Sequence, residues 1–403
     1  MIAKTAHALA AAGASMPFLP GAGARLGVLG GGQLGRMFVH AAQRLGYRVV
    51  VLDPDAESPA GAAADVHLQA AYEDPAALAE LQRQCVAVTT EFENVPADVL
   101  RQLARTVRVS PPADAVQVCQ HRRREKQAFV AAAVPCAPHA FLDSAGALAH
   151  PALAALLPGI LKTASLGYDG KGQCAVASLA ELGPAWAALG SVPCVLERRL
   201  SLRHEISVIV ARSASGEMVH LPVQQNLHRD GVLAVTQVPP PDVDDACCAW
   251  AVQQAQTLAT ALGYVGVLCV EFFVLTDGSL VANELAPRPH NSGHASIDAC
   301  DSSQFDLQVR TLAGLPLLAP RQHSPAVMLN LLGDLWFAAN QPLPRTPDWA
   351  SVLALPGVHL HLYGKAQARP GRKMGHLTVT AATAAQAHAV AQQAAHCLGL
   401  PAF

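Results

Sequence analysis

Two acidic residues in the second half of the chain could hold a divalent metal ion. Glu271 and Glu284 lie on the arms of a predicted hairpin, residues 267–275 and 280–285, whose connection contains the turn signal Asp-Gly. Carboxylate oxygens are hard ligands that suit Mg²⁺, and Asn283 could reach the same ion or a bound nucleotide. Apolar residues flank both acids, and a carboxylate buried without a cation is costly, so a metal site is favoured over two solvated side chains.

A glycine-rich segment upstream could bind phosphate groups. A predicted strand over residues 159–162 delivers Lys162, and the segment Gly-Tyr-Asp-Gly-Lys-Gly-Gln, residues 167–173, delivers Lys171. Two ammonium groups and several backbone N–H donors suit a triphosphate. The same segment could be an ordinary surface turn. Only together with the acid pair does it indicate a site for a magnesium-bound nucleotide.

An earlier glycine turn allows several interpretations. Residues 30–35 match G-x-G-x-x-G between a predicted strand, residues 26–29, and an amphipathic helix that runs to Leu45. Asp53 follows at about the spacing found in dinucleotide-binding domains. The glycines could equally permit close helix packing or hold another ligand. A NAD-dependent oxidoreductase is therefore one hypothesis, although it gives Lys171 and the acid pair no role.

Other polar residues lie on or after predicted strands. Residues 288–294 leave the second hairpin arm, and the guanidinium of Arg288 could pair with bicarbonate or a carboxylate. Glu197 begins a stretch in which residues 198–200 are expected to continue a strand, and Glu205 lies on the next strand. A backbone edge of this kind can bind adenine, and a carboxylate can accept ribose hydroxyls. Without the neighbouring motifs, both would be interpreted as surface glutamates.

Composition limits the class of protein. At 403 residues the chain suits two or three domains, and 51% hydrophobic with 14% charged residues suits a compact α/β protein. A net charge of −2 argues against nucleic-acid binding, and the basic run at residues 122–126 is interpreted as the solvated face of a helix. We expect no membrane span. The ten cysteines are interpreted as reduced core residues of a cytoplasmic protein, and His228 as a loop histidine.

The order of predicted elements divides the chain into four parts. Residues 1–23 are predicted to be a disordered extension. Strands and helices alternate in residues 24–121, which predicts a Rossmann-like parallel sheet. Short strands dominate residues 122–320, and three strands followed by an alanine-rich helix form a small C-terminal domain, residues 321–403. The predicted fold class is therefore α/β combined with α+β.

Five segments together resemble the ATP-grasp enzyme family of 5-(carboxyamino)imidazole ribonucleotide synthetases of purine biosynthesis, over about residues 25–380. They are Gly-Gly-Gly-Gln-Leu-Gly, Thr-Glu-Phe-Glu-Asn, Gly-Tyr-Asp-Gly-Lys-Gly-Gln, Asn-Glu-Leu-Ala-Pro-Arg-Pro-His-Asn-Ser-Gly-His and Arg-Pro-Gly-Arg-Lys-Met-Gly-His. The last two are the most specific, because the glycine loop and the acid pair occur in many ATP-grasp ligases. The resemblance implies that residues 122–320 form an ATP-grasp domain whose lid spans about residues 135–200.

The resemblance also implies a reaction. ATP would phosphorylate bicarbonate to carboxyphosphate, and the amine of 5-aminoimidazole ribonucleotide would capture the resulting CO₂ as a carbamate. The products would be the carboxyamino nucleotide, ADP and phosphate, with Mg²⁺ as the cofactor. The family further implies a homodimer. The cysteine pattern, the net charge and the hydropathy already predict a cytoplasmic protein with no nucleic-acid or membrane partner.

Residue roles follow from the resemblance by position. The residues expected to bind ATP are Arg122, Lys162, Gly167, Tyr168, Asp169, Gly170, Lys171, Gly172, Gln173, Glu197, Arg198, Arg199, Leu200, Glu205, His228, Asn283 and Glu284. Those expected to bind the aminoimidazole nucleotide are Gln33, Leu34, Glu91, Tyr168, Lys365 and Arg372. Glu271 and Glu284 would bind Mg²⁺. Asp169, Lys171 and Arg288 would be catalytic, with Arg288 orienting bicarbonate.

Two observations complicate the assignment of this chain to the synthetase family. Residues 164–166, Ala-Ser-Leu, stand where the family usually has an Arg and a second Gly, so one phosphate contact could be missing. Another ATP-grasp ligase, such as formate-dependent glycinamide ribonucleotide transformylase or biotin carboxylase, would share the loop and the acids. The segment from Arg369 to His376 favours the carboxylating synthetase.

Overall fold

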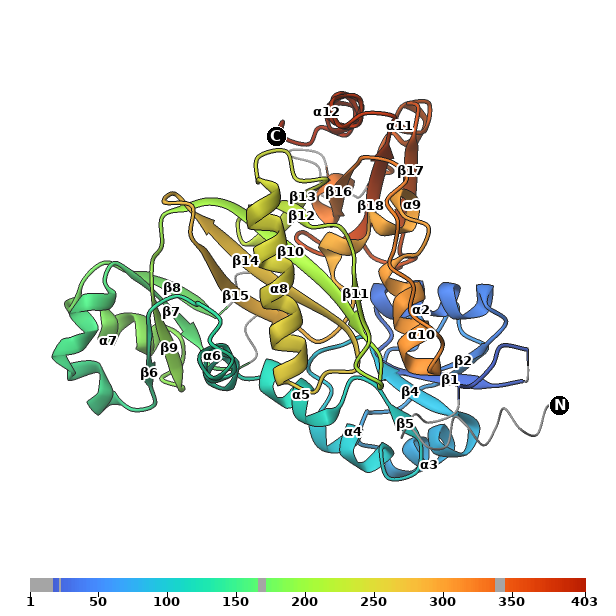
Figure 1. The fold of residues 1–403 in the computed structure, drawn as a ribbon, viewed down its shortest axis with the longest axis horizontal. Helices are drawn as coiled ribbons and strands as arrows, with labels where there is room; N and C mark the ends of the chain where they lie inside the picture. Colours follow the sequence, from blue (N-terminus) through green and yellow to red (C-terminus); the bar gives the residue numbers. More distant parts are fainter. Residues whose placement is uncertain (1–16, 22, 166–171, 338–344) are drawn as a thin grey trace.

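The computed structural model describes residues 17–21, 23–165, 172–337 and 345–403. They form three sheets with helices packed around them. A small lobe, formed by residues 139–165 and 172–198, lies at the opposite end of the molecule from the N-terminal sheet (Figure 1). Within these ranges no helix has both the length and the apolar run needed to cross a membrane.

The N-terminal sheet is entirely parallel, as the alternation of strands and helices predicts. Its strand order is β3 (Val66–Leu68), β2 (Arg48–Leu52), β1 (Arg25–Leu29), β4 (Ala87–Thr90) and β5 (Arg108–Val109). Its helices are α2 (Gln33–Arg44), α3 (Pro75–Gln84), α4 (Ala97–Leu103) and α5 (Ala113–Cys119). One face packs on α2, and the core there includes Phe38 with Phe305 of a later helix; the other packs on α3 and α4 through Leu81 and Leu100.

The central sheet is antiparallel throughout and carries the acid pair. Its strand order is β15 (Leu280–Ala286), β14 (Gly266–Leu275), β10 (Leu202–Arg212), β12 (Gln224–Arg229), β13 (Val232–Val238), β16 (Ala326–Leu332), β18 (Lys373–Thr380) and β17 (Val358–Leu362), with β11 (Met218–His220) paired to β10. Helix α8 (Asp245–Ala261) buries Ala251, Ala255 and Leu258 against β10 and β14. Helix α10 (Gln304–Ala313) fills the space between this sheet and α2. The predicted hairpin of residues 267–285 is therefore confirmed.

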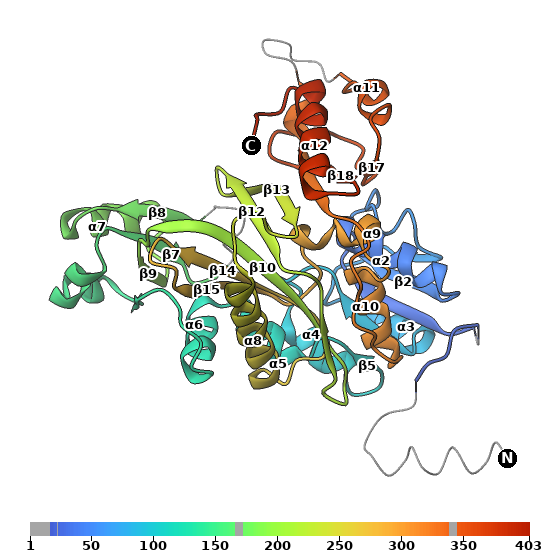
Figure 2. The same ribbon diagram turned by 45° about the horizontal axis from the view of Figure 1, so that its top comes forward.

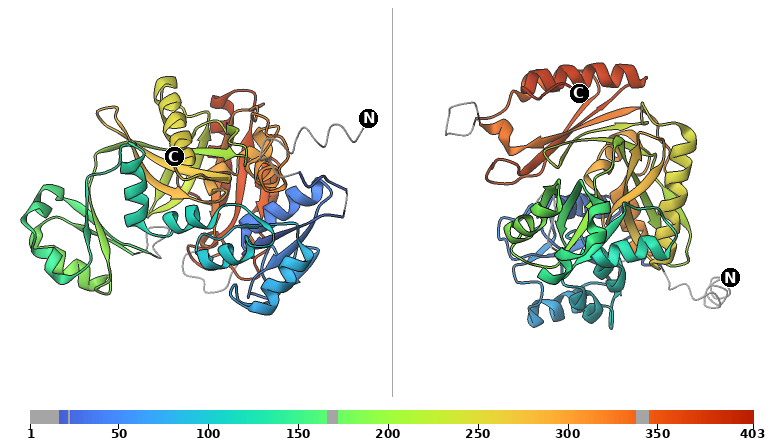
Figure 3. Two further views of the ribbon diagram at one scale, coloured as in Figure 1. Left: turned by 60° about the horizontal axis from the view of Figure 1, so that its bottom comes forward. Right: turned by 90° about the vertical axis from the view of Figure 1, so that its left-hand side faces the viewer.

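The C-terminal segment extends the central sheet instead of forming a separate one. Strand β16 pairs with β13, and β18 and β17 follow it to the edge. Helices α11 (Trp349–Leu353) and α12 (Ala384–Leu398) close a core of their own over these strands, and α12 lies across this end of the sheet (Figures 2 and 3). The short helices α9 (Ser296–Ala299), η4 (Asn291–Gly293) and η5 (Gly333–Trp336) connect the strands.

The small lobe at the end of the molecule opposite the N-terminal sheet has its own sheet and core (Figure 1). The order is β6 (His139–Leu142), β9 (Cys194–Arg198), β7 (Gly159–Thr163) and β8 (Gln173–Val176), covered by α7 (Leu179–Ala188), η2 (Ala145–Ala149) and η3 (Pro151–Leu156). Helix α6 (Arg122–Ala131) leads into it. The expectation that residues 198–200 continue the strand is wrong beyond Arg198, where β9 ends.

The cysteine prediction holds in part. All ten cysteines are free thiols, and four of them are buried. Cys397 on α12 is exposed, so the interpretation of every cysteine as a core residue is wrong at this position. It lies on the outer face of an amphipathic helix whose buried side consists of alanines and Leu398.

Candidate active site

The two predicted metal ligands face each other on neighbouring strands. Glu271 of β14 and Glu284 of β15 are register partners, and a bulge follows Glu271. Nε2 of His290 lies 3.1 Å from Oε1 of Glu271. Burial, and then the charge of Glu284, raises the pKa of Glu271 to about 7. Two carboxylates held this close repel each other when both are ionised, and a bound cation removes that cost.

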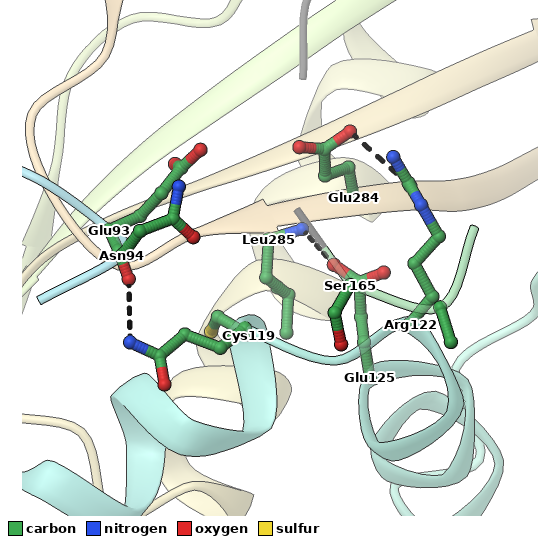
Figure 4. A pocket seen from close by; sticks show the side chains of 10 residues that line it. Glu93, Asn94, Cys119, Arg122, Glu125, Ser165, Glu284 and Leu285 are labelled. Carbon is green, nitrogen blue, oxygen red and sulfur yellow. Dashed lines mark hydrogen bonds and ion pairs between the residues drawn. The ribbon is translucent and has the colours of Figure 1, made fainter. Parts of the chain in front are cut away.

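Helix α6 brings a third carboxylate to the pair. Glu125 is buried, and its Oε1 accepts the backbone N–H of Leu285 at 2.6 Å. Burial, followed by Glu284, raises the pKa of Glu125 to about 7. Arg122 at the start of the helix places Nη1 3.9 Å from Oε2 of Glu284. These residues line one pocket, in which Arg122 and Glu284 point toward each other (Figure 4).

The prediction that residues 122–126 form a solvated helix face is therefore wrong for Glu125 and Lys126, whereas Arg124 is exposed. Glu125 and Lys126 are almost completely buried because this side of α6 packs against β15. Phe129, which is also buried, follows Lys126 by three positions and Glu125 by four. Residues at this spacing lie on one face of a helix, and in the sequence this spacing was the signal that could have indicated their burial.

Two lysines meet a buried glutamate at the junction of the lobes. Nζ of Lys162 lies 2.8 Å from Oε2 of Glu197, and Nζ of Lys126 lies 3.2 Å from its Oε1. Burial alone would raise the pKa of Glu197, but the two lysines outweigh it and lower the pKa to about 2. Lys126 also donates to the carbonyl of Asn283 at 3.2 Å. Two cations around one anion leave a net positive charge beside the acid pair.

The predicted residues Glu205 and His228 contact each other. Nδ1 of His228 on β12 lies 2.7 Å from Oε2 of Glu205 on β10. Burial lowers the pKa of His228, but Glu205 and Glu271 raise it further, so the net direction is upward. Glu205 therefore favours the protonated form of the imidazole. Because His228 lies on β12 of the central sheet, the interpretation of it as a loop residue is wrong.

Arg288 joins the end of the hairpin to the N-terminal domain. Its Nε donates to Oε2 of Glu93 at 2.9 Å, Nη2 donates to the same oxygen, and Nη1 donates to the carbonyl of Pro289 at 3.2 Å. Glu93 lies in the loop after β4. The sequence assigned no role to Glu93, although it lies two residues after Glu91 in the same Thr-Glu-Phe-Glu-Asn segment.

The first glycine turn is closed by carboxylates of the chain itself. Glu91 accepts the backbone N–H groups of Gly32 at 2.8 Å and Gly35 at 3.1 Å, and Asp53 accepts that of Gly31 at 2.7 Å. A Cβ atom at Gly31 would overlap the side chain of Asp53, so glycine is required there. Burial raises the pKa of Glu91.

This arrangement removes the basis of the dinucleotide hypothesis. A dinucleotide site needs a free acid to accept ribose hydroxyls. Here Asp53 also accepts the hydroxyl of Tyr72 at 2.7 Å and the N–H of Asp55 at 2.9 Å. Gln33, the first residue of α2, is partly exposed, whereas the side chain of Leu34 is buried in the core of that domain.

Two basic residues flank the turn between β17 and β18. Nζ of Lys365 donates to the carbonyl of Lys373 at 2.7 Å and lies 5.7 Å from the ring centroid of Tyr363. Burial, followed by the charge of Arg372, lowers the pKa of Lys365 to about 8. Nη1 of Arg372 donates to the carbonyl of Gln367 at 2.8 Å.

The predicted glycine loop is only partly described. Gly167, Tyr168, Asp169, Gly170 and Lys171 lie outside the described residues. The carbonyl of Gly172 accepts the N–H of Thr163, and Gln173 is the register partner of Lys162. Arg198 and Arg199 are exposed, and Leu200 is partly buried after the end of β9.

The pocket is lined by two of the residues that stand where the family usually has an Arg and a second Gly. Ala164 and Ser165 lie in its wall beside Arg122, and the carbonyl of Ala164 accepts the N–H of Arg122 at 2.8 Å. Leu166 lies outside the described residues.

These features define the class of the protein. A parallel-sheet domain, an antiparallel sheet with a facing acid pair, and a small lobe that supplies a lysine together form an ATP-grasp ligase. The chain matches the model of the ATP-grasp domain over residues 127–305. It also matches the ribonucleotide synthetase preATP-grasp domain over residues 24–120 and the phosphoribosylaminoimidazole carboxylase C-terminal domain over residues 326–390.

The chain belongs to the N5-carboxyaminoimidazole ribonucleotide synthase family. It is 45% identical over 358 residues to the synthase of Brucella melitensis, an alignment that covers 88% of this chain and 96% of that protein. The synthase of Bacillus subtilis is 38% identical, with 88% and 91% covered. A crystal structure of the synthetase from Staphylococcus aureus complexed with ADP is 35% identical, with a TM-score of 0.86 and coverage of 95% and 99%. The Aspergillus clavatus enzyme in complex with ADP and 5-aminoimidazole ribonucleotide is 33% identical, with a TM-score of 0.84 and coverage of 93% and 98%.

Proposed function

We propose that this chain uses ATP and bicarbonate to carboxylate the amine of 5-aminoimidazole ribonucleotide in de novo purine biosynthesis. The observation that carries the proposal is the link from the acid pair to the N-terminal domain. Arg288 leaves the strand of Glu284 and pairs with Glu93, two residues after the acid that closes the first glycine turn. The proposed phosphoryl-transfer site and the proposed site for the second substrate therefore adjoin at the Arg288–Glu93 pair.

The atoms of the reaction balance without another reactant. An oxygen of bicarbonate attacks the γ-phosphorus of ATP, ADP leaves, and carboxyphosphate forms. Its C–O bond to phosphorus-bound oxygen breaks and gives CO₂ and inorganic phosphate. The exocyclic amine then forms an N–C bond to CO₂ and loses a proton, which gives the carboxyamino nucleotide.

The acid pair fits Mg²⁺. Glu271 and Glu284 offer only oxygen donors. The raised pKa of Glu271 reflects burial first and the charge of Glu284 second, and a bound cation relieves both costs of ionisation. The ion, when bound, would neutralise phosphate charge during transfer. We propose that Glu125, through Leu285, holds β15 so that Glu284 keeps its orientation.

ATP is proposed to lie between the small lobe and the central sheet. Lys162 and Arg122 supply positive charge to its phosphates, and Glu197 fixes Lys162 in position. The edge from Glu197 to Leu200, Glu205, His228 and Asn283 would hold the nucleoside part. Gly167 to Gln173 would cover the phosphates, with Asp169 and Lys171 serving proton transfer and carboxyphosphate.

The aminoimidazole nucleotide is proposed to bind at the first glycine turn. Gln33 has a partly exposed side chain at that turn, whereas Leu34 has its side chain in the core, so only the backbone of Leu34 is left to contact a ligand. Lys365 and Arg372 would hold the ribonucleotide phosphate, Glu91 would support the turn, and Tyr168 would contact the nucleotide. Arg288, with Glu93 fixing its plane, would orient bicarbonate.

Other properties are proposed from family membership and chemistry. The ten free thiols suit a reducing cytoplasm. We propose a homodimer, which sedimentation velocity at several protein concentrations would test. Small molecules are the proposed partners, with neither nucleic acid nor membrane.

The proposal is tested by phosphate release from Mg-ATP and bicarbonate. We expect release to rise when 5-aminoimidazole ribonucleotide is added, together with formation of the carboxyamino nucleotide. Formate with glycinamide ribonucleotide serves as the matched alternative substrate pair. Stimulation by that pair alone would replace the proposal with a transformylase activity, and no stimulation by either pair would contradict both.

A further inference from the structure

Histidines from separate parts of the chain gather between α9 and the last two strands of the sheet. His361 on β17 and His376 on β18 are register partners, and their ring centroids lie 4.4 Å apart. The ring centroid of His294, two residues before α9, lies 4.6 Å from that of His376. Antiparallel partners place their side chains on the same face, so the sheet itself creates this cluster.

One carboxylate reaches into the cluster from α9. Oδ2 of Asp298 lies 2.8 Å from Nε2 of His361, and Oδ1 lies 3.7 Å from Nδ1 of His359. The side chain of Asp298 is only 11% exposed. Asp298 thus holds two imidazoles, of which that of His361 is 28% exposed and that of His359 is 42% exposed.

His376 has a nitrogen that the rest of the described chain leaves unsatisfied. Its Nδ1 lies 3.0 Å from the hydroxyl of Tyr363, but its Nε2 is buried and has no hydrogen-bond partner among the described residues. A buried polar atom without a hydrogen-bond partner destabilises the folded protein. The ring itself is completely buried. Such an atom points to a ligand that the protein binds here.

We propose that Asp298, His361 and His376 bind a divalent transition-metal ion such as Zn²⁺. One donor atom from each residue lies within 4.8 Å of the others. Two imidazole nitrogens and one carboxylate oxygen suit Zn²⁺ and its neighbours, whereas Mg²⁺ prefers oxygen alone. The Tyr363 hydroxyl on the opposite nitrogen of His376 matches the outer hydrogen bond that usually orients a metal-binding histidine.

Binding requires one local rearrangement. The rings of His361 and His376 are nearly parallel, with an interplanar angle of 12°, so His361 must turn for both nitrogens to point at one ion. The ion then takes the place of the proton between His361 and Asp298. It would tie α9 to the β17–β18 hairpin, which carries Lys365 two residues after Tyr363.

The experiment is a titration of metal-free protein with Co²⁺, followed by visible absorption, in the presence of excess Mg²⁺ and ADP. Mg²⁺ and ADP are added to fill the proposed ATP site at the acid pair. The Co²⁺ spectrum distinguishes nitrogen and oxygen ligands from the thiolates of the ten cysteines. We expect one Co²⁺ per chain, displaced by Zn²⁺. Asp298→Asn and His361→Gln should each weaken binding at least tenfold, whereas Glu271→Gln and the distant His388→Gln should leave it unchanged.

Several results would overturn the proposal. Absence of stoichiometric Co²⁺ binding by the unaltered protein would show that the cluster is a hydrogen-bonded histidine stack only. Binding that survives both Asp298→Asn and His361→Gln, or that is lost in Glu271→Gln, would place the ion elsewhere. Thermal unfolding of each metal-free variant shows whether it is folded, and the titration of the unaltered protein decides the question if neither variant folds.

Discussion

Glu271→Gln is expected to stabilise the metal-free protein above pH 7 and to abolish its response to Mg²⁺. Burial, followed by the charge of Glu284, raises the pKa of Glu271 from 4.5 to about 7. At ~1.4 kcal/mol for each pH unit, ionising this side chain in the folded, metal-free protein costs roughly 3 kcal/mol. Because the folded-state pKa is raised, the contribution of the Glu271 carboxyl to the free energy of unfolding is fully present below pH 4.5. This contribution is lost as the pH rises through about 7.

Thermal unfolding at pH 5 and pH 8, with and without Mg²⁺, measures this effect. At pH 8 the variant should unfold a few degrees above the unaltered protein, and at pH 5 the two should agree more closely. Mg²⁺ should stabilise the unaltered protein at pH 8 and have little effect on the variant. Glu217→Gln, which removes an exposed carboxylate beside β11, is the charge-matched control. Equal unfolding temperatures at both pH values, or undiminished stabilisation of the variant by Mg²⁺, would refute the reasoning.

Other predictions concern the remaining parts of the site. Glu284→Gln should abolish turnover while leaving the circular dichroism spectrum unchanged, and normal kinetics would contradict the metal site. Lys126→Met removes one of two cations from buried Glu197 and should destabilise the protein by about 3 kcal/mol, with partial recovery when Glu197→Gln is added, as thermal unfolding would show. Lys365→Ala and Arg372→Ala should mainly raise KM for the aminoimidazole nucleotide. Because the pKa of Lys365 is lowered to about 8, KM of the unaltered enzyme should rise above pH 8, and this rise should disappear in Lys365→Ala.

The sequence predicted the elements whose patterns are local. The parallel N-terminal sheet follows from strands alternating with helices, and the hairpin that carries Glu271 and Glu284 follows from apolar runs around an Asp-Gly turn. The three C-terminal strands were also predicted, but their joining to the central sheet was not. Pairing of β13 with β16 connects residues almost a hundred positions apart, and no local pattern specifies it.

In the candidate site, too, the sequence predicted what local motifs specify and missed what depends on long-range packing. Motifs indicated Lys162, Glu197 and Arg288, whereas their partners Lys126 and Glu93 were identified only by the fold. Lys126 lies in a run of charges that is typical of a solvated helix, and its burial depends on packing of α6 against β15.

The fate of a bicarbonate oxygen tests the central claim most directly. If bicarbonate attacks the γ-phosphorus, one of its oxygens stays on phosphorus when carboxyphosphate breaks down. Turnover with ¹⁸O-labelled bicarbonate, ATP and 5-aminoimidazole ribonucleotide should therefore give inorganic phosphate that carries a single ¹⁸O, as mass spectrometry would detect. Phosphate without ¹⁸O from bicarbonate, formed while the carboxyamino nucleotide accumulates, would contradict the account.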